Sequence, residues 1–131
     1  MTIDKLAWVH VVERKLLVVR SHARQMLYLP GGKRDAGESD QQALIREIRE
    51  ELSIELKPAS ILPAGVFCAQ ADAMPDGVDV RMTCYRSDFD GRLQIAHEIA
   101  EMRWLDSTDR TQFSAVGRQV LDQLVEQGVI D

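Results

Sequence analysis

The stretch that decides the fold reads GGKRDAGESDQQALIREIREELSI and spans residues 31–54. Its first residues are rich in glycine and charge, which predicts a turn. A helix then starts near Ser39, where Ser39 and Gln42 suit a capping box. The helix carries an apolar stripe at helical spacing, formed by Leu44, Ile45, Ile48 and Leu52. One face of this helix is therefore expected to pack into the protein.

The neighbouring face of the same helix carries three acids, Glu47, Glu50 and Glu51. At about 100° per residue, the three lie within roughly 100° of one another around the axis. Carboxylates crowded in this way repel each other, and a solvated helix surface gains nothing from them. A divalent cation would reverse the sign of the interaction, and Mg²⁺ prefers such oxygen ligands. The alternative is a charged helix face without a ligand.

This stretch resembles the Nudix box, which joins a glycine, a distant glutamate and an Arg-Glu-apolar-x-Glu-Glu run at fixed gaps. The matching residues of this chain are Gly32, Glu38, Arg46, Glu47, Ile48, Glu50, Glu51 and Ile54, so that the box covers residues 32–54. The one departure is Ser53, where the family has a glycine that eases the chain out of the helix. The serine is expected to strain the backbone rather than to remove a ligand.

The resemblance implies roles for the residues of the box. The implied metal ligands are Glu47, Glu50, Glu51 and the backbone carbonyl of Gly31. The general base varies across the family, and Glu47 is our choice for it. Arg46 is expected to orient the acids by pairing with Glu38 or Glu50, while Glu38 and Gly32 have structural roles. The implied cofactor is Mg²⁺, with Mn²⁺ as a possible substitute.

Composition limits the classes of partner. The chain has 131 residues, 16 Lys and Arg against 21 Asp and Glu, and a formal net charge of −5. This length predicts one domain over residues 1–131. The acidic balance argues against a general nucleic-acid or membrane-surface binder. The N-terminus MTIDKLAWV does not have the form of a signal peptide, which predicts a cytoplasmic protein.

Outside the box, apolar runs separated by turn residues predict strands. Residues 6–12 and 16–19 are expected to pair as a hairpin, and 27–29 to form a short strand. Residues 61–70 and 78–86 are expected to pair antiparallel, with 102–105 as a last strand and 113–127 as a helix. Cys68 and Cys84 fall in strand-like runs and are expected to be core thiols. The order predicts an α+β fold with a mixed β-sheet between helices, and the resemblance implies a Nudix-type α/β/α sandwich.

Four residues outside the helix are candidates for the site. Arg24 and Lys33 lie where cations would help to bind phosphates. Trp8 is either a core residue or a ring that stacks on a base. The family often places one further acid before a strand that carries Trp, and Glu98 fits that position, with Glu101 as the alternative.

The resemblance implies hydrolysis of a phosphoanhydride in a nucleoside diphosphate derivative. The short chain is most similar to MutT-like pyrophosphohydrolases, which convert a nucleoside triphosphate to the monophosphate and pyrophosphate. An ADP-ribose or nucleotide-sugar pyrophosphatase is the alternative enzyme, and a non-catalytic nucleotide-sensing module is the alternative of another class. The partner is then a small nucleotide rather than a nucleic acid or a membrane. Small members of the family are often dimers, so a homodimer is a candidate assembly.

Overall fold

Two helices and nine short or medium strands build the protein, whose computed structural model describes residues 1–131. The strands are β1 Thr2–Trp8, β2 Val11–Val12, β3 Lys15–Ser21, β4 Gly31–Lys33, β5 Glu55–Leu56, β6 Leu62–Gln70, β7 Asp79–Arg86, β8 Phe89–Asp90 and β9 Ile99–Leu105. The helices are α1 Asp40–Leu52 and α2 Ala115–Glu126, with 3₁₀ turns at Pro58–Ser60 and Ser107–Gln112.

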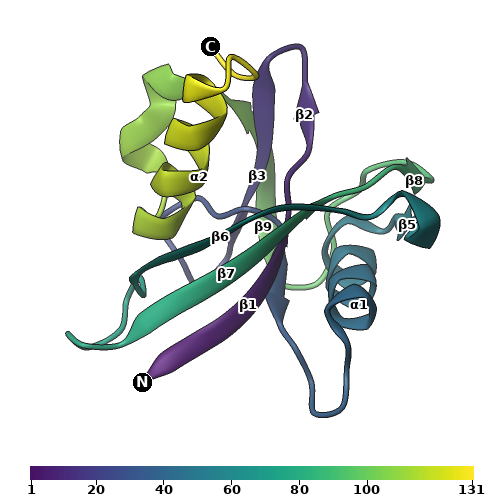
Figure 1. The fold of residues 1–131 in the computed structure, drawn as a ribbon, viewed down its shortest axis with the longest axis horizontal. Helices are drawn as coiled ribbons and strands as arrows, with labels where there is room; N and C mark the ends of the chain where they lie inside the picture. The colour runs from purple at the N-terminus through teal and green to yellow at the C-terminus, as the bar shows by residue number, and fades with distance from the viewer.

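The strands form three small sheets. The largest has the order β4-β1-β7-β6 and is mixed, because β1 runs parallel to β7 while β1–β4 and β7–β6 are antiparallel. A second sheet has the order β2-β3-β9, and β5 pairs with β8. The helices α1 and α2 lie on opposite sides of the central strands (Figure 1). This arrangement confirms the predicted α+β sandwich.

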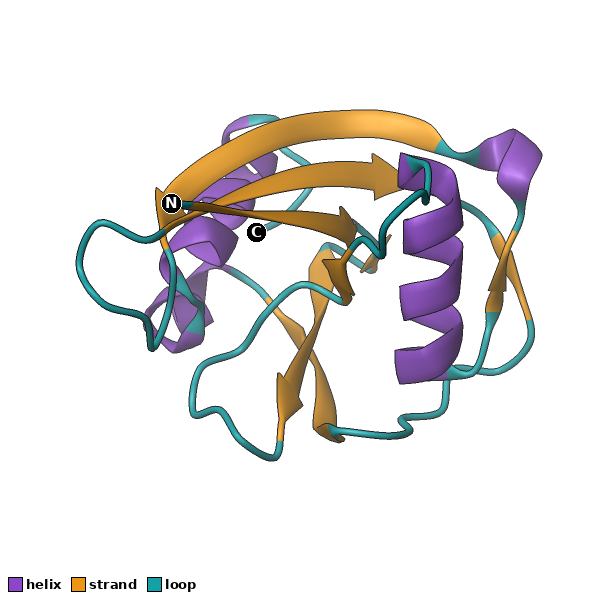
Figure 2. Cartoon of the chain, turned by 90° about the horizontal axis from the view of Figure 1, so that it is seen from below, coloured by secondary structure: helices purple, strands orange, loops and turns teal.

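Each helix closes its own hydrophobic core. The core under α1 includes Leu6, Leu17, Leu44, Ile48 and Leu52. The core under α2 includes Val18, Met82, Phe113, Val120 and Leu121. Neighbouring residues of β1 and of β3 therefore point into different cores, because side chains alternate between the two faces of a strand. Because both faces of these strands are buried, their sequences are continuous apolar runs rather than alternating ones. Figure 2 shows the long strands running between the two helices.

The predicted hairpin of residues 6–12 and 16–19 is wrong in its first arm. The chain changes sheets between Trp8 and Val11: the amide of Val9 donates to the carbonyl of Tyr85, whereas the carbonyl of His10 accepts from the amide of Leu17. Only β2 pairs with β3, through two residues. The sequence pattern did not indicate this change of sheet, because the run is apolar on both sides of it.

The glycine pair also differs from its prediction. Gly31 and Gly32 lie in strand β4, opposite Ala7 and Leu6 of β1, rather than in a turn. The predicted strand 27–29 is reduced to two isolated bridges, Val19 with Tyr28 and Leu27 with Phe113. Pairing with β1 therefore begins after Pro30, where the sequence pattern predicted that a strand would end.

The later elements agree with their predictions. Strands β6 and β7 pair antiparallel, and the register shifts between Pro63 and Gly65, as a bulge at Gly65 requires. The side chain of Ser114 caps α2 by accepting from the amide of Gly117. Gly128 has a φ of +75° just beyond the helix, which suits a glycine.

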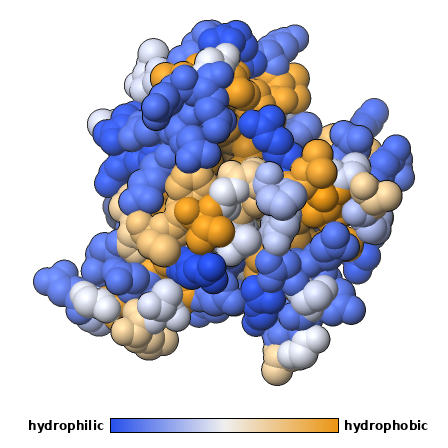
Figure 3. Space-filling model, viewed as in Figure 1, coloured by the Kyte–Doolittle hydropathy of each residue, from blue (hydrophilic) through white to orange (hydrophobic).

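The surface adds two observations. Cys84 is buried, but Cys68 is exposed, so the prediction of two core thiols is wrong for Cys68. Most of the face shown in Figure 3 is hydrophilic, with apolar side chains gathered near its middle. Leu62 and Val66 of the edge strand β6 are exposed. Neither helix has the length and apolar character needed to cross a membrane.

Candidate active site

Local signals set the position of helix α1. The predicted capping box is present: the Ser39 hydroxyl accepts from the amide of Gln42, and the Gln42 side chain accepts from the amide of Ser39. At the other end Ser53 has φ 61° and ψ 29°, the left-handed conformation that the family's glycine would adopt without strain. The departure from the box is thus a matter of backbone conformation.

Beside β4 lies a pocket of about 390 Å³. Its lining includes Gly31, Gly32, Glu47, Glu51 and Glu98 at the acidic end. These residues come from β4, α1 and the approach to β9. The structure therefore brings the predicted acids of the box and the predicted loop acid to one cavity, with the exception of Glu50.

Glu51 is the most buried acid of the site, with 6% of its surface exposed. It forms no ion pair, and its hydrogen-bond donor in the protein is the amide of Gly31, at 3.0 Å from Oε1. The pKa of Glu51 is raised from 4.5 to about 8, chiefly by burial and in smaller part by the nearby acids Glu47 and Glu98, whereas the Gly31 amide and Lys5 oppose the shift. A buried carboxyl group without a cation is unfavourable in the ionised form.

Arg46 connects the loop before α1 to the acids. Its Nε and Nη2 each donate to the carboxylate of Glu38 at 2.8 Å, its Nη2 donates to the carbonyl of Lys33, and its Nη1 donates to Glu47 at 2.9 Å. The pKa of Glu38 falls to about 2 because of the hydrogen bonds from Arg46 and from the amide of Asp35. The contact predicted between Arg46 and Glu38 is present, and such a bidentate pair is geometrically selective.

The two glycines of β4 allow close approach. A Cβ at Gly31 would stand 2.0 Å from the carbonyl oxygen of Leu6, and one at Gly32 would stand 2.5 Å from the carboxylate of Glu47. The strand therefore passes directly against the acidic face of α1. Gly32 keeps room for Glu47, which explains a glycine at this place in the box.

The three acids of the helix are not equivalent. Glu47 and Glu51 line the pocket, whereas Glu50 does not, and its side chain is 47% exposed and lies 3.5 Å from Arg46. Burial raises the pKa of Glu47, while Arg46 opposes the shift. No three acidic, histidine or cysteine side chains converge as a complete metal site.

The donor set nevertheless fits Mg²⁺. Buried Glu51 lacks a cation, Glu47 lies beside it, and Mg²⁺ usually takes one or two carboxylates together with water and substrate phosphates. Ligation by Glu47, Glu50, Glu51 and the carbonyl of Gly31 stays a prediction.

The structure distinguishes the two candidates for the predicted loop acid, Glu98 and Glu101, by their positions. Glu98 lines the pocket, and it is close enough to raise the pKa values of Glu47 and Glu51. Glu101 lies on β9 and pairs with Arg20 at 3.0 Å. Its charge is thus already compensated outside the pocket, which favours Glu98 over Glu101.

A group of cations, which we call the cationic wall, also lines the pocket. Arg24 and Lys33 lie there as predicted, together with Lys5 of β1. Lys5 and Lys33 are direct partners across β1 and β4, where like charges are destabilising. Burial lowers the pKa of Lys5, and Lys33 and Arg24 lower it further. None of the three cations has a carboxylate partner within 4.0 Å. A bound anion would relieve this repulsion.

Trp8 does not lie in this pocket, so of its two predicted roles the structure favours the core residue over the ring that stacks on a base. Its side chain is fully buried in the core under α1, and its indole N–H donates to the carbonyl of Ser87 at 3.2 Å. One ring face stacks on His10, with 4.4 Å between the centroids. Trp8 is therefore a core residue.

Sequence reasoning missed several pocket residues, namely Lys5, Tyr28, Asp72 and Ser114. Lys5 escaped notice because β1 was assigned to a hairpin. A lysine within an otherwise apolar strand, facing another lysine, is the signal that the correct pairing would have supplied. Tyr28 and Asp72 come from a loop and a turn, whose side-chain directions follow no period.

Comparison with known proteins identifies relatives of this chain. Over 84 residues the chain is 34% identical to CTP pyrophosphohydrolase of Escherichia coli (strain K12), a match that covers 63% of this chain and 57% of that protein. The match thus spans little more than half the length of this relative.

Solved structures share the fold. The MutT NUDIX hydrolase from Burkholderia pseudomallei has a TM-score of 0.75 at 22% identity, with 95% of this chain and 98% of that chain covered. The E. coli dihydroneopterin triphosphate pyrophosphohydrolase has a TM-score of 0.73 at 16% identity, with 95% of each chain covered. The family model described as the NUDIX domain matches residues 5–124, and this protein belongs to the Nudix hydrolase family.

Proposed function

We propose that this protein is a Mg²⁺-dependent nucleoside triphosphate pyrophosphohydrolase that releases a nucleoside monophosphate and pyrophosphate, as a single domain over residues 1–131. One observation carries the proposal. One buried acid without a cation, Glu51, faces the same pocket as two neighbouring cations without an acid partner, Lys5 and Lys33. A metal-bound polyphosphate compensates both sets of charges at once.

Each group has a place in the reaction. Hydrolysis of a phosphoanhydride requires neutralised phosphoryl oxygens, an aligned water and removal of its proton. Bound Mg²⁺, or Mn²⁺ in its place, supplies charge neutralisation and lowers the pKa of a bound water. Glu47, Glu50 and Glu51 would hold the metal, Glu47 would also take the proton from the water, and Arg46 with Glu38 keeps Glu47 in position. Glu98 adds negative charge next to the metal site.

The cationic wall favours a triphosphate among the candidate substrates. Lys5, Arg24 and Lys33 provide three positive charges along the pocket, in addition to the metal, and a longer phosphate chain makes use of more of them. The similarity to a CTP pyrophosphohydrolase supports the same class. A purely sensing module would have no need for a buried, uncompensated Glu51. We expect the enzyme to act on cytoplasmic nucleotides.

A substrate panel tests this function. Purified protein with Mg²⁺ is incubated with canonical and oxidised nucleoside triphosphates, ADP-ribose and a dinucleoside polyphosphate, and products are separated to rank kcat/KM. The expected result is highest kcat/KM for a nucleoside triphosphate, with pyrophosphate as the product. Highest kcat/KM for ADP-ribose would assign the alternative reaction, and no turnover on the whole panel would favour a sensor. Chelation of Mg²⁺ should abolish turnover, and surviving hydrolysis would contradict the metal's role.

A further inference from the structure

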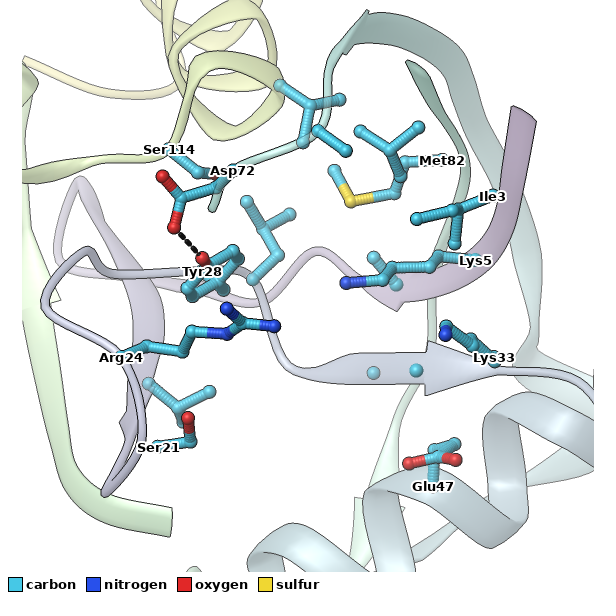
Figure 4. Close-up of a pocket in the computed structure, with 18 of the residues that line it drawn as sticks. Ile3, Lys5, Ser21, Arg24, Tyr28, Lys33, Glu47, Asp72, Met82 and Ser114 are labelled. Atoms are coloured by element: carbon cyan, nitrogen blue, oxygen red, sulfur yellow. Dashed lines mark hydrogen bonds between the residues drawn. The ribbon is translucent and has the colours of Figure 1, made fainter. Parts of the chain in front are cut away.

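The end of the pocket remote from the acids is formed by different elements. The turn between β6 and β7 supplies Asp72, the N-cap of α2 supplies Ser114, and the segment before β4 supplies Tyr28. Figure 4 shows Asp72 and Ser114 at one end of the view and Glu47 at the other, with the cationic side chains between them. Metal-binding acids, cations and this far end therefore follow one another along the pocket, in the order of a metal-bound triphosphate and its nucleoside.

Apolar side chains make up much of the pocket wall. They include Ile3, Leu29, Val80, Met82 and Val116. A flat ring can lie between such side chains, and the few polar groups at the end then decide which ring is accepted. The polar groups at this end of the pocket thus carry the selectivity.

Asp72 is the acceptor at this end. The hydroxyl of Tyr28 donates to Oδ2 of Asp72, and this pair is drawn in Figure 4. Burial and the carboxylate both raise the pKa of Tyr28, so the phenol keeps its proton and stays a donor. The other oxygen of Asp72, Oδ1, has no hydrogen-bond partner in the protein. The Oγ atom of Ser114 already accepts from the amide of Gly117 in the helix cap.

We propose that Asp72, held by Tyr28, selects nucleotides whose base carries an exocyclic amino group. The inference rests on the proposed function. The amino group of cytosine or adenine donates a hydrogen bond to Oδ1 of Asp72. A carbonyl group at the same ring position, as in uracil or hypoxanthine, presents a lone pair to the carboxylate and is repelled.

Matched substrate pairs isolate this one group. CTP and UTP differ by amino against carbonyl at one ring position, and ATP and ITP make the same exchange in a purine. A site that hydrogen-bonds a substrate group rejects the analogue without it, because its own polar group is left unpaired. We expect the amino member of at least one pair to have a kcat/KM about 10–100-fold higher, the range of a hydrogen bond to a charged group.

Asp72→Asn is the decisive variant, because it replaces a carboxylate, which only accepts, by an amide of the same shape that both donates and accepts. Either end of the amide can face the base, since the Tyr28 hydroxyl can donate to the amide oxygen or accept from the NH₂ group. The preference for the amino base should therefore fall at least tenfold. Asp76→Asn is the matched control. It lies in the same turn, is exposed and does not line the pocket, so the ratio should stay unchanged.

A replacement variant and a binding measurement keep the test decisive if Asp72→Asn does not fold. If Asp72→Asn does not fold, as judged by circular dichroism, Asp72→Ser replaces it, and its ratio should approach one because a hydroxyl both donates and accepts. Calorimetry with CMP and UMP, or AMP and IMP, should show the same preference in binding without turnover.

The failures of the two proposals are distinguishable. If the wild-type protein hydrolyses no nucleoside triphosphate, the proposed function is wrong. If it hydrolyses triphosphates without discriminating within either pair, or if Asp72→Asn leaves the ratio unchanged, the role of Asp72 is overturned.

Discussion

Glu51 is an acid that the folded protein holds in an unfavourable state when no metal is bound. It is buried, and its pKa rises from 4.5 to about 8. The unfolded chain therefore loses this proton near pH 4.5, while the folded chain keeps it to about pH 8. Between these values the folded state binds more protons, so the free energy of unfolding falls as pH rises. The acid is retained at the expense of stability, which fits a role in binding a cation.

Glu51→Gln tests this statement. The neutral amide has no charge to desolvate, so the metal-free variant should melt at a higher temperature than the wild type at pH 8, with a smaller difference at pH 5. Turnover should be lost, since the metal loses its buried ligand. Thermal melts at both pH values in a chelator, with a turnover assay in Mg²⁺, make the measurement. Near-normal turnover would remove Glu51 from the mechanism.

Ser53 shows the effect of one backbone conformation. Its φ of 61° places Cβ too close to the backbone. A glycine has no Cβ and avoids this close contact. Ser53→Gly should therefore raise the free energy of unfolding by about 0.5–1 kcal/mol, after the entropy that glycine adds to the unfolded chain. Urea denaturation measures the change. Ser53→Ala retains Cβ and should bring no gain, so an equal gain in both variants would disprove the conformational account.

At the scale of elements, the contact of β4 with α1 sets the position of Glu47. Gly32→Ala would place Cβ 2.5 Å from that carboxylate, and the flexible side chain would have to move. We expect kcat to fall about 100-fold, since a displacement near 1 Å can cost that much, with little change in melting temperature.

Gly77→Ala is the control for this variant. Its Cβ meets no atom within 4 Å, but its φ is +89°. The substitution should lower stability and leave kcat unchanged. If Gly32→Ala instead lost stability and retained full kcat, the glycine would serve packing alone.

The elements also show what sequence can predict here. Helix α1, its capping box and its acidic face were predictable, because the signals lie within a few residues of one another. The positions of β1 and β4 were not, because residues distant in sequence decide them: β1 takes its partners from residues 31–33 and 79–85. The same distance hid Lys5, whose neighbour Lys33 belongs to another strand. Trp8 was ambiguous because a tryptophan in a strand suits either a core or a pocket.

For the whole molecule, Leu121 predicts a separation of stability from activity, because it belongs to the core but does not line the pocket. Leu121 is fully buried under α2, on the far side of the sheet from α1. Leu121→Ala should lower the free energy of unfolding by about 2–5 kcal/mol through loss of apolar contacts and a residual cavity. The folded fraction should keep its kcat and KM. Glu126→Ala, on the exposed side of α2, should change neither quantity.

The parallel pairing of β1 with β7 sets the order of events in biosynthesis. Thr2 pairs with Asp79 and Trp8 with Tyr85, so β1 leaves the ribosome long before its partner β7. Contacts so distant in sequence slow folding, because a long loop must close before they form. Until residue 86 emerges, the apolar residues of β1 lack their permanent neighbour. Nascent chains of this protein should therefore bind chaperones through the β1 segment until β7 has emerged.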